Sequence, residues 1–560
     1  MPFISNSNGR ASAGSVDAIV IGAGFGGLAA TYRLREAGLE VRSFERAEDV
    51  GGTWLWNKYP GARTDSEGTF YRLNFFDDLF GPWRYSERFP AQPEVLTYLR
   101  TVADKLDLRR HYSFSTSVER AIWDEARARW EVDTDDGKTW SAKYLISAVG
   151  IQSAPIRPTL EGLEEYQGQV YHSATWPAGD VDFSGKRVAV IGTGSSGIQI
   201  VPQVAKQAEH LTVFQRTPNF SVPMNNAPLT DADHEEFEGN RADFRRRVRE
   251  HPFSMPYSFT GRKALDFGDE ERAAIFEEAW SKGGFRFMIE SFDDIGVDKA
   301  ANDTASNFLR GKIKELVSDP ATAEKLLPSY PYTVKRPPSG TEFFETFNQD
   351  NVDLVDVRAT PFTHATPTGL ATTDAEYDFD VIIFATGFDF LTGSLFRMDV
   401  RGRGGMSLEE RWRDELSIYL SIAVNGFPNL FILGGPLYPG GNWPTTAEEV
   451  STFVSQVIAR GERLGADTIE VKEVAEREWS SHAAEIAEQT LMYAYGREAN
   501  SYGFGANMEG KLQTVHFYMG GANAVFAVFD QQVASGFPSF EFAGTDSAAN
   551  ALEGESQHAS

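Results

Sequence analysis

The sequence of 560 residues contains no cysteine. Enzymes that pass electrons through a redox-active cysteine pair, such as the disulfide reductases, are therefore excluded. The sequence also lacks any run of about 18 apolar residues, so no membrane span is expected. The nine histidines show no metal-ligand spacing such as H-E-x-x-H, and no metal site is expected.

Positive charge is scarce as well. The 53 lysine and arginine residues stand against 80 aspartate and glutamate residues, which leaves a net charge of −27. A nucleic-acid partner or an anionic membrane surface is therefore not expected. In such an acidic chain, a local cluster of lysine and arginine residues is a stronger indication of a site for an anionic ligand.

Both ends of the chain are small and polar. Residues 1–15 are rich in serine, asparagine and glycine and have no apolar centre, which predicts a flexible tail and not a signal peptide. Residues 547–560 predict a second loose tail. With neither a signal nor a span, we expect a cytoplasmic protein, and the sequence does not indicate its oligomeric state.

Two segments share the order strand, glycine-rich turn, helix, strand. In residues 17–45 an apolar run ends at a G-x-G-x-x-G turn, and residues 187–216 repeat this arrangement. In this context the turn is the dinucleotide-binding fingerprint, in which the second glycine lets the backbone approach a pyrophosphate and the third lets the helix pack on the strand. The predicted cofactor-binding residues are Gly22, Gly24 and Gly27 in the first turn, and Gly192, Thr193, Gly194, Ser195, Ser196, Gly197 and Gln199 in the second.

The residues that close the second strand of the two segments have opposite charges. Glu45 stands in the first segment at the position that Arg216 takes in the second. A carboxylate here accepts hydrogen bonds from the free ribose hydroxyls of FAD or NAD, whereas an arginine suits the 2′-phosphate of NADP. The first segment is therefore expected to bind FAD, and the second segment NADPH. The FAD is expected to be non-covalent, since there is no cysteine to attach it.

These segments predict an α/β fold with two Rossmann-like dinucleotide-binding domains. We expect residues 1–149 and 385–560 to form the FAD-binding domain, and residues 150–222 and 333–384 to form the NADP-binding domain. Residues 223–332 carry charged and apolar residues at helical spacing, which predicts a helical insertion that caps the second domain. The length suits two or three such units.

A further motif, Tyr166-x-Gly168-x-x-x-His172-x-x-x-Trp176-Pro177, lies just before the second turn. By composition alone, His172 is more often a hydrogen-bonded structural histidine than a catalyst. The motif resembles the F-x-G-x-x-x-H-x-x-x-W-P signature of the type I Baeyer–Villiger monooxygenases, a class B flavoprotein monooxygenase family. The resemblance continues in family order over nearly the whole chain, through Gly51-Gly52-Thr53-Trp54, YPGAR-x-D at 59–65, GTGSSGIQ at 192–199, Lys335-Arg336-Pro337-Pro338, ATGFD at 385–389, GFPNLF at 426–431 and GAN at 505–507.

This resemblance implies an activity. NADPH reduces FAD, O2 adds at the flavin C4a carbon, and the peroxide attacks a ketone, which becomes an ester or lactone. Arg336 matches the family's catalytic arginine, and Asp65 would pair with it and hold it in place. Lys335 would reach the NADPH phosphate beside Arg216 and Thr217. The other positions carried over are the cofactor-binding residues Gly52, Thr53, Trp54 and Tyr502, and the residues Tyr166, Gly168, His172, Trp176 and Pro177 of a linker between the domains.

The chain departs from the family in two loops. Residues 434–443 are bulkier than the usual small-residue segment, so linear, cyclic, aromatic and steroid ketones all remain candidate substrates. In residues 501–511, Tyr502 replaces a tryptophan common in relatives, and Met508-Glu509 replaces Ile-Pro. Two other functions stay open: a flavin monooxygenase that oxidises nitrogen or sulfur, and a flavin-binding sensor without catalysis.

Overall fold

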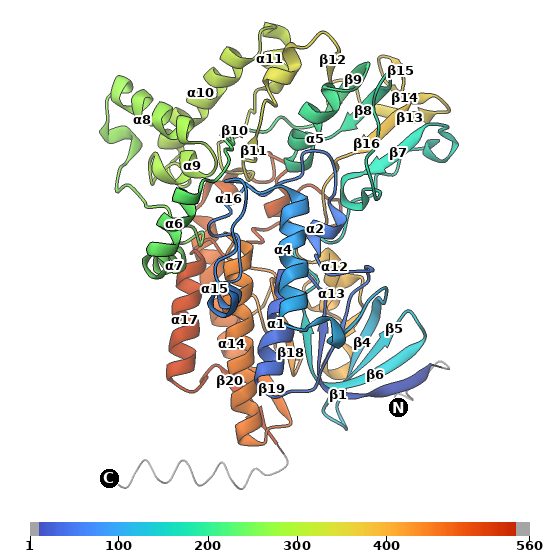
Figure 1. Cartoon of the computed structure of the whole chain (residues 1–560), viewed down its shortest axis with the longest axis vertical. Helices are drawn as coiled ribbons and strands as arrows, with labels where there is room; N and C mark the ends of the chain where they lie inside the picture. Colours follow the sequence, from blue (N-terminus) through green and yellow to red (C-terminus); the bar gives the residue numbers. More distant parts are fainter. Residues whose placement is uncertain (1–9, 545–560) are drawn as a thin grey trace.

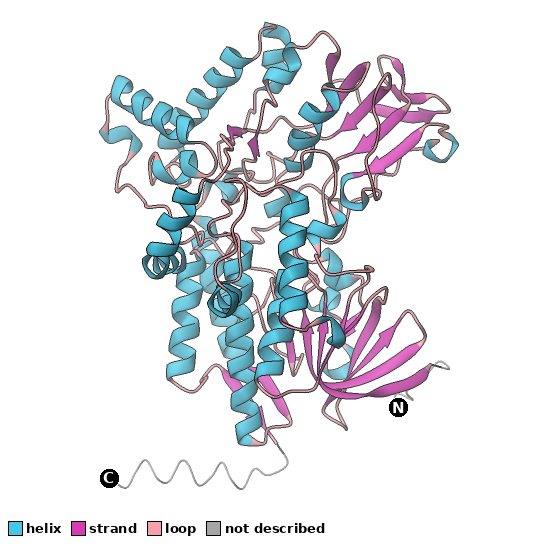
Figure 2. Ribbon diagram, in the orientation of Figure 1, coloured by secondary structure: helices cyan, strands magenta, loops and turns pink. Residues whose placement is uncertain are grey.

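The computed structural model describes residues 10–544. Strands are concentrated in two separate sheets, and most helices lie beside or between them (Figure 2). Figure 1 shows the first sheet at the lower right, the second at the upper right and helices α8 to α11 toward the upper left. The tail expected at residues 547–560 lies outside the described residues, and so do residues 1–9 of the tail expected at residues 1–15.

The first sheet has a parallel centre. β1 (Ala11–Ile21) pairs in parallel with β2 (Val41–Phe44) and β6 (Lys138–Ser147), and α1 (Phe25–Glu36) connects β1 to β2. The strand order is β17-β4-β5-β6-β1-β2-β3, and β18 also pairs with β6. The remaining strands are β3 (Tyr112–Ser113), β4 (Val118–Asp124), β5 (Arg129–Thr134), β17 (Val400–Arg401) and β18 (Leu430–Ile432).

Residues 11–15 belong to a strand, so the expectation of a flexible tail was wrong for them. They begin β1 and pair with β6, starting with Ala11 opposite Lys138. Backbone hydrogen bonds to a neighbouring strand do not require apolar side chains. Trp140 also covers Gly14, since a Cβ at Gly14 would lie 3.4 Å from a carbon of the indole ring. Composition therefore did not reveal this part of the strand.

The second sheet is parallel throughout, with the order β12-β9-β8-β16-β7. α5 (Ser195–Ala205) connects β8 (Arg187–Ile191) to β9 (His210–Gln215), as the second glycine-rich segment predicts. Both glycine-rich turns thus stand at the carboxyl ends of parallel strands, where ligands bind in α/β sheets. The other strands are β7 (Gln169–His172), β12 (Val352–Asp356) and β16 (Val381–Phe384), with a small antiparallel sheet of β13 (Phe362–Thr366), β14 (Gly369–Thr372) and β15 (Glu376–Asp378) beside them.

The segment between the sheets is helical, but it does not cap the second domain alone. Ile313 and Leu326 share a hydrophobic cluster with side chains of the second sheet. Arg249, in contrast, forms an ion pair of 2.8 Å with Asp530 of α17 (Ala522–Ala534), on the side of the first sheet. The helices are α6 (Asp231–Gly239), α7 (Arg241–Glu250), α8 (Asp269–Lys282), α9 (Arg286–Glu290), α10 (Lys299–Leu316) and α11 (Pro320–Leu326).

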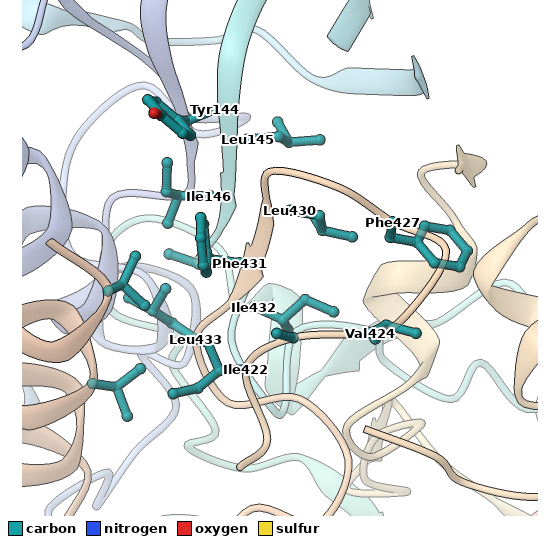
Figure 3. Close-up of a cluster of buried hydrophobic side chains, with 14 of the residues drawn as sticks. Tyr144, Leu145, Ile146, Ile422, Val424, Phe427, Leu430, Phe431, Ile432 and Leu433 are labelled. Carbon is teal, nitrogen blue, oxygen red and sulfur yellow. The ribbon is translucent and has the colours of Figure 1, made fainter. Parts of the chain in front are cut away.

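The C-terminal part of the chain returns to the first sheet through a buried core. Figure 3 shows Leu430, Phe431 and Ile432 of β18 close to Leu145 and Ile146 of β6, and β18 pairs with β6 in parallel. Burial of each such side chain stabilises the fold by roughly 1.5–3 kcal/mol. α14 (Trp443–Leu464) and α17 contribute to the same cluster. The remaining helices and strands are α2 (Thr53–Trp56), α3 (Asn74–Phe80), α4 (Gln92–Lys105), α12 (Gly393–Phe396), α13 (Leu408–Arg411), α15 (Glu473–Glu488), α16 (Leu491–Tyr495), β10 (Val222–Pro223), β11 (Ser339–Gly340), β19 (Thr468–Val471) and β20 (Phe540–Ala543).

The described residues include neither a membrane-spanning helix nor a cluster of metal ligands. Within residues 10–544, every helix is too short or too polar to cross a lipid bilayer. The same part of the chain holds no group of three or more histidine, aspartate or glutamate side chains placed to bind a metal ion.

Candidate active site

The two glycine-rich turns have nearly the same geometry. Gly22 and Gly192 have φ angles of 110° and 111°, a region that favours glycine. A Cβ on Gly22 would lie 2.4 Å from the carbonyl oxygen of Ala148, and one on Gly192 would lie 2.5 Å from that of Ala385. Neither position therefore tolerates a side chain, and the turn brings each helix N-terminus against the neighbouring strand.

The helix N-termini are open to an anionic ligand. α1 follows Gly24 and α5 follows Gly194, and for both helices the described residues supply no side-chain hydrogen bond to the cap. A Cβ on Gly194 would meet no described atom within 4 Å, which leaves room for a pyrophosphate beside the backbone. The unpaired N–H groups and the positive end of each helix dipole suit a phosphate there. Both turns therefore fit a dinucleotide.

A single cavity of about 1580 Å³ connects the two turns. It extends from the first sheet, past residues 151–158, which connect the two sheets, to the second sheet and to the helical segment. Gly27 and Gly197 do not line it, because they face the carbonyl oxygens of Gly22 and Gly192 and let the helices pack closely. The expected cofactor-binding residues that do line it are Gly22, Gly24, Glu45, Gly52, Thr53, Trp54, Asp65, Gly192, Thr193, Gly194, Ser195, Ser196, Gln199, Arg216, Thr217, Lys335, Arg336 and Tyr502.

Glu45 is held in place at the end of β2. Its carboxylate accepts hydrogen bonds from the backbone N–H groups of Ala23 and Ala47, both at 2.8 Å. Burial raises the pKa of Glu45, and the two backbone hydrogen bonds oppose that rise. Each carboxylate oxygen keeps a further lone pair, so Glu45 has capacity for the ribose hydroxyls of FAD.

Lys335 and Arg216 bring two positive charges together at the second turn. Burial lowers the pKa of Lys335 to about 8, and the charge of Arg216 adds to the effect. Thr217 lies beside them, with its carbonyl oxygen accepting a hydrogen bond of 3.3 Å from Thr193 Oγ1. Like charges held close together are unfavourable until an anion neutralises them. This arrangement fits the 2′-phosphate of NADP.

The pKa of Lys335 leads to a prediction about pH. A protonated ammonium would attract the 2′-phosphate, so we expect NADPH to bind strongly below the pKa of about 8 and more weakly as the pH rises through it. We expect kcat/KM for NADPH to fall by up to about tenfold per pH unit above that value. Measured pH profiles for NADPH and NADH check this, since NADH lacks the 2′-phosphate. A Lys335→Arg variant should lose the decline, and a flat wild-type profile for NADPH would contradict the prediction.

Arg336 lies between the two turns. Its guanidinium forms an ion pair with Asp65 and a hydrogen bond of 3.5 Å with Ser195 Oγ at the start of α5. The ring of Phe285 lies 5.2 Å from its Cζ atom. Burial alone lowers the pKa of Arg336, but Asp65 and Tyr502 reverse this, and the net pKa is raised. A permanent positive charge is therefore fixed in the wall of the cavity that both glycine-rich turns line.

The signature residues of the linker lie outside the cavity. The hydroxyl of Tyr166 donates to the carbonyl oxygen of Phe379 at 2.9 Å, and a Cβ on Gly168 would lie 2.2 Å from that hydroxyl oxygen. Trp176 is buried in the core of the second sheet, and Pro177 follows it. Among the described residues that line the cavity, none of the five signature positions appears.

His172 fastens the crossing between the sheets. Its Nδ1 accepts from the N–H of Ala174 at 3.1 Å, so Nε2 carries the proton and lies 3.2 Å from the carbonyl oxygen of Ile156. Nε2 is also 3.2 Å from Thr386 Oγ1. Burial lowers the pKa of His172, which keeps the ring neutral. These contacts suit a linker and not a proton donor to a substrate.

Several cavity residues carry no signal in the sequence. Phe285 comes from the helical segment, which has no nucleotide motif, and reaches Arg336 only through tertiary packing. The loop at 434–443 contributes Tyr438 and Trp443, whose rings pack edge to face at 5.4 Å. In the loop at 501–511, Glu509 is exposed and is not among the described lining residues. Asn507 of the GAN motif also lines the cavity, and other lining side chains without a sequence signal are Phe253, Met255, Met288, Met492, Asn500 and Phe517.

Comparison with known proteins decides the family. A family model described as FMO-like, flavin-binding monooxygenase-like, matches residues 16–224. The chain is 41% identical to a protein of Pseudooceanicola batsensis named Baeyer-Villiger monooxygenase, over 94% of this chain and 97% of that protein. The chain belongs to the Baeyer–Villiger monooxygenases. The resemblance inferred from its motifs is confirmed, and so is the α/β fold with two Rossmann-like domains.

Further relatives and solved structures add detail. The chain is 42% identical to cyclohexanone 1,2-monooxygenase of Acinetobacter sp, over 90% of this chain and 92% of that protein. It is also 40% identical to phenazine N-monooxygenase PhzNO1 of Lysobacter antibioticus, over 90% and 93%. The crystal structure of cyclohexanone monooxygenase from Rhodococcus sp. Phi1 bound to NADP+ matches with a TM-score of 0.92 and 40% identity, over 95% of this chain and 100% of that one. The complex of OTEMO with FAD and NADP matches with a TM-score of 0.90 and 37% identity, over 94% and 99%. This Baeyer–Villiger monooxygenase is thus a flavoprotein that uses FAD and NADPH.

Proposed function

We propose that Arg336, held by Asp65, is the catalytic residue of a Baeyer–Villiger oxidation that converts a small-molecule ketone to an ester or lactone with NADPH and O2. The observation that carries the proposal is the position of the guanidinium. It contacts Asp65 and, at the second turn, Ser195, and it lines the same cavity as both glycine-rich turns. A group in that position faces the space that reactants bound at the two turns would share.

The side chains support distinct parts of this reaction. When bound, FAD reduced by NADPH supplies the electrons that activate O2. Arg336 stabilises the negative charge that develops during oxygen transfer, because a guanidinium does not lose its proton at working pH. Asp65 fixes the orientation of that guanidinium. The cavity walls keep water away, which strengthens each electrostatic contact.

The two nucleotides would be held by different groups. The turn at Gly22 and Gly24 and the carboxylate of Glu45 suit FAD, with Gly52, Thr53 and Trp54 beside them. The turn at residues 192–197 suits the pyrophosphate of NADPH, and its 2′-phosphate would lie between Arg216, Thr217 and Lys335. We propose the domain boundaries stated above on the same grounds, and the cytoplasmic location stays a prediction.

The cavity wall favours an apolar ketone. Beside Arg336 stands Phe285, and the same cavity is lined by the thioethers of Met288 and Met492 and by the rings of Trp443 and Phe517. Such a wall stabilises hydrocarbon and offers little to a charged substrate. Reaction with ketones of different sizes would show which size the cavity accepts.

A second candidate reaction is N-oxidation of an aromatic heterocycle. It is favoured by one observation, the 40% identity to phenazine N-monooxygenase PhzNO1. N-oxidation adds oxygen to a nitrogen lone pair and does not require a fixed cation to keep the oxidant anionic. The ion pair of Arg336 with Asp65 therefore favours the ketone reaction.

The test is product analysis under ¹⁸O2. Purified protein with FAD and NADPH is given linear, cyclic, aromatic and steroid ketones, and phenazine in a parallel reaction. We expect an ester or lactone that carries one labelled oxygen, formed in proportion to the NADPH consumed. Formation of a phenazine N-oxide with no ester from any ketone would overturn the proposal in favour of the second reaction.

A further inference from the structure

Residues 500–511, the bridging loop, contact the segment that carries Lys335 and Arg336, and they also contact residues 389–390, which follow β16. The hydroxyl of Ser501 donates to the carbonyl oxygen of Val334 at 2.9 Å, directly before Lys335 in the chain. The ring of Tyr502 packs edge to face on Phe390 at 5.1 Å. Burial raises the pKa of the Tyr502 hydroxyl, and the nearby charge of Arg336 opposes that rise. The bridging loop therefore lies against the segment that carries the site's cations.

The start of the bridging loop also reaches Arg216. Its hydrogen-bond partners orient the amide of Asn500 so that the oxygen accepts from the Arg216 guanidinium and the nitrogen donates to the carbonyl oxygen of Ala506. The φ angle of Asn500 is 54°, a left-handed conformation that few residues other than glycine and asparagine adopt readily. The contact with Arg216 thus depends on the backbone conformation at Asn500 and on the position of Ala506 in the same loop.

A partly buried ion pair holds the far end of the bridging loop. The ammonium of Lys511 donates to Asp389 Oδ1 at 2.5 Å and to the carbonyl oxygen of Phe390 at 2.6 Å. The side chains of Lys511 and Asp389 are 7% and 19% exposed. Asp389 is itself fixed, because its N–H donates to the carbonyl oxygen of Ala154 and its carboxylate packs where a Cβ on Gly393 would lie. The lysine is therefore anchored to a rigid point between the two sheets.

We propose that Lys511 is a positioning residue for NADP(H). Its ion pair with Asp389 holds the bridging loop in place, so that Asn500 keeps Arg216 directed at the 2′-phosphate and Tyr502 stays beside Arg336. The inference rests on the proposed function of the second turn. A surface lysine would gain little from an ion pair, but removal of one partner of a buried pair leaves the other charge without compensation.

The test is NADP+ binding to the oxidised, FAD-loaded protein, measured by calorimetry without ketone. For Lys511→Met we expect a Kd about tenfold higher, with the FAD content unchanged. Lys511→Arg should restore most of the affinity. The matched control is Lys138→Met, which removes an exposed ion pair with Asp136 in the turn between β5 and β6 and should leave the Kd unchanged.

Hydrogen exchange separates this role from a general loss of stability. In Lys511→Met, faster exchange confined to residues 500–511 supports the proposal. Asp389→Asn should weaken NADP+ binding to a similar degree, and the double variant should be no weaker than the single variants, because all three remove the same ion pair. If exchange also increases across β1 and β6, NADP+ binding to Asp389→Asn distinguishes the two explanations, because this substitution keeps the size of the side chain.

Wild-type affinity for NADP+ in both single variants would overturn the inference. Failure of the proposed function gives a different result: wild-type protein would then not bind NADP+ or not convert ketones. A protein that binds NADP+ and oxidises ketones, but is insensitive to changes at Lys511, removes the inference alone.

Discussion

Replacement of Arg336 by methionine is expected to lower kcat for ester formation by a factor of about 100 or more. The substitution keeps most of the side-chain volume and removes the positive charge. The charge of Asp65 would then lie in the cavity without its partner, next to the place where negative charge develops. The measurement is ester formation with NADPH and a ketone, together with the flavin absorbance of the purified variant.

The controls for Arg336 separate charge from geometry. The Arg336→Lys variant keeps a positive charge but loses the planar fork of the guanidinium, so we expect an intermediate rate. Arg358→Met removes an exposed arginine that pairs with Asp356 at the end of β12, and it should leave kcat unchanged. If Arg336→Met retains FAD and forms ester at the wild-type rate, the proposed catalytic role is wrong.

The second large effect is expected in the choice between NADPH and NADH. Arg216→Ala should raise the KM for NADPH by about 10- to 100-fold and leave the KM for NADH nearly unchanged, because only NADPH carries the 2′-phosphate. The substitution also removes the positive charge that, in addition to burial, lowers the pKa of Lys335. Lys335 should therefore remain protonated to higher pH. Initial rates with each coenzyme at one ketone concentration measure the effect.

A matched control for Arg216 is Lys206→Ala. Lys206 lies at the end of α5, the helix that follows the second turn, and pairs with Glu342 on the surface. It should change neither KM. An equal loss of affinity for NADPH and NADH in Arg216→Ala would indicate a general disturbance of the site and would contradict a specific contact with the 2′-phosphate.

The predictions that succeeded rest on local patterns. Each glycine-rich turn, its two strands and its helix occupy about 30 consecutive residues, and their order is set by short-range geometry. The unit of two parallel strands and one helix at each glycine-rich turn therefore follows from the sequence, and comparison with relatives confirms the family that the motifs indicate. Composition was a poorer guide at residues 11–15, where backbone pairing with β6 decides the structure.

The helical segment shows the opposite case. Its spacing predicts helices, and helices form, but the spacing does not say which surface they cover. Arg249 binds Asp530 on the side of the first sheet, while Ile313 and Leu326 pack with the second. Phe285 of this segment lies against Arg336, and no motif in the segment predicts that contact.

The sequence by itself determined the two glycine-rich turns and the sign of the charge at the end of the strand that follows each of them, because a turn and the residue that ends the next strand are joined by a short stretch of chain with few possible conformations. Only the tertiary structure decided what surrounds them. Arg336 and Asp65 are 271 residues apart, and Lys511 and Asp389 are 122 apart. Such pairs meet because buried surfaces pack in one arrangement, and that arrangement depends on the whole chain.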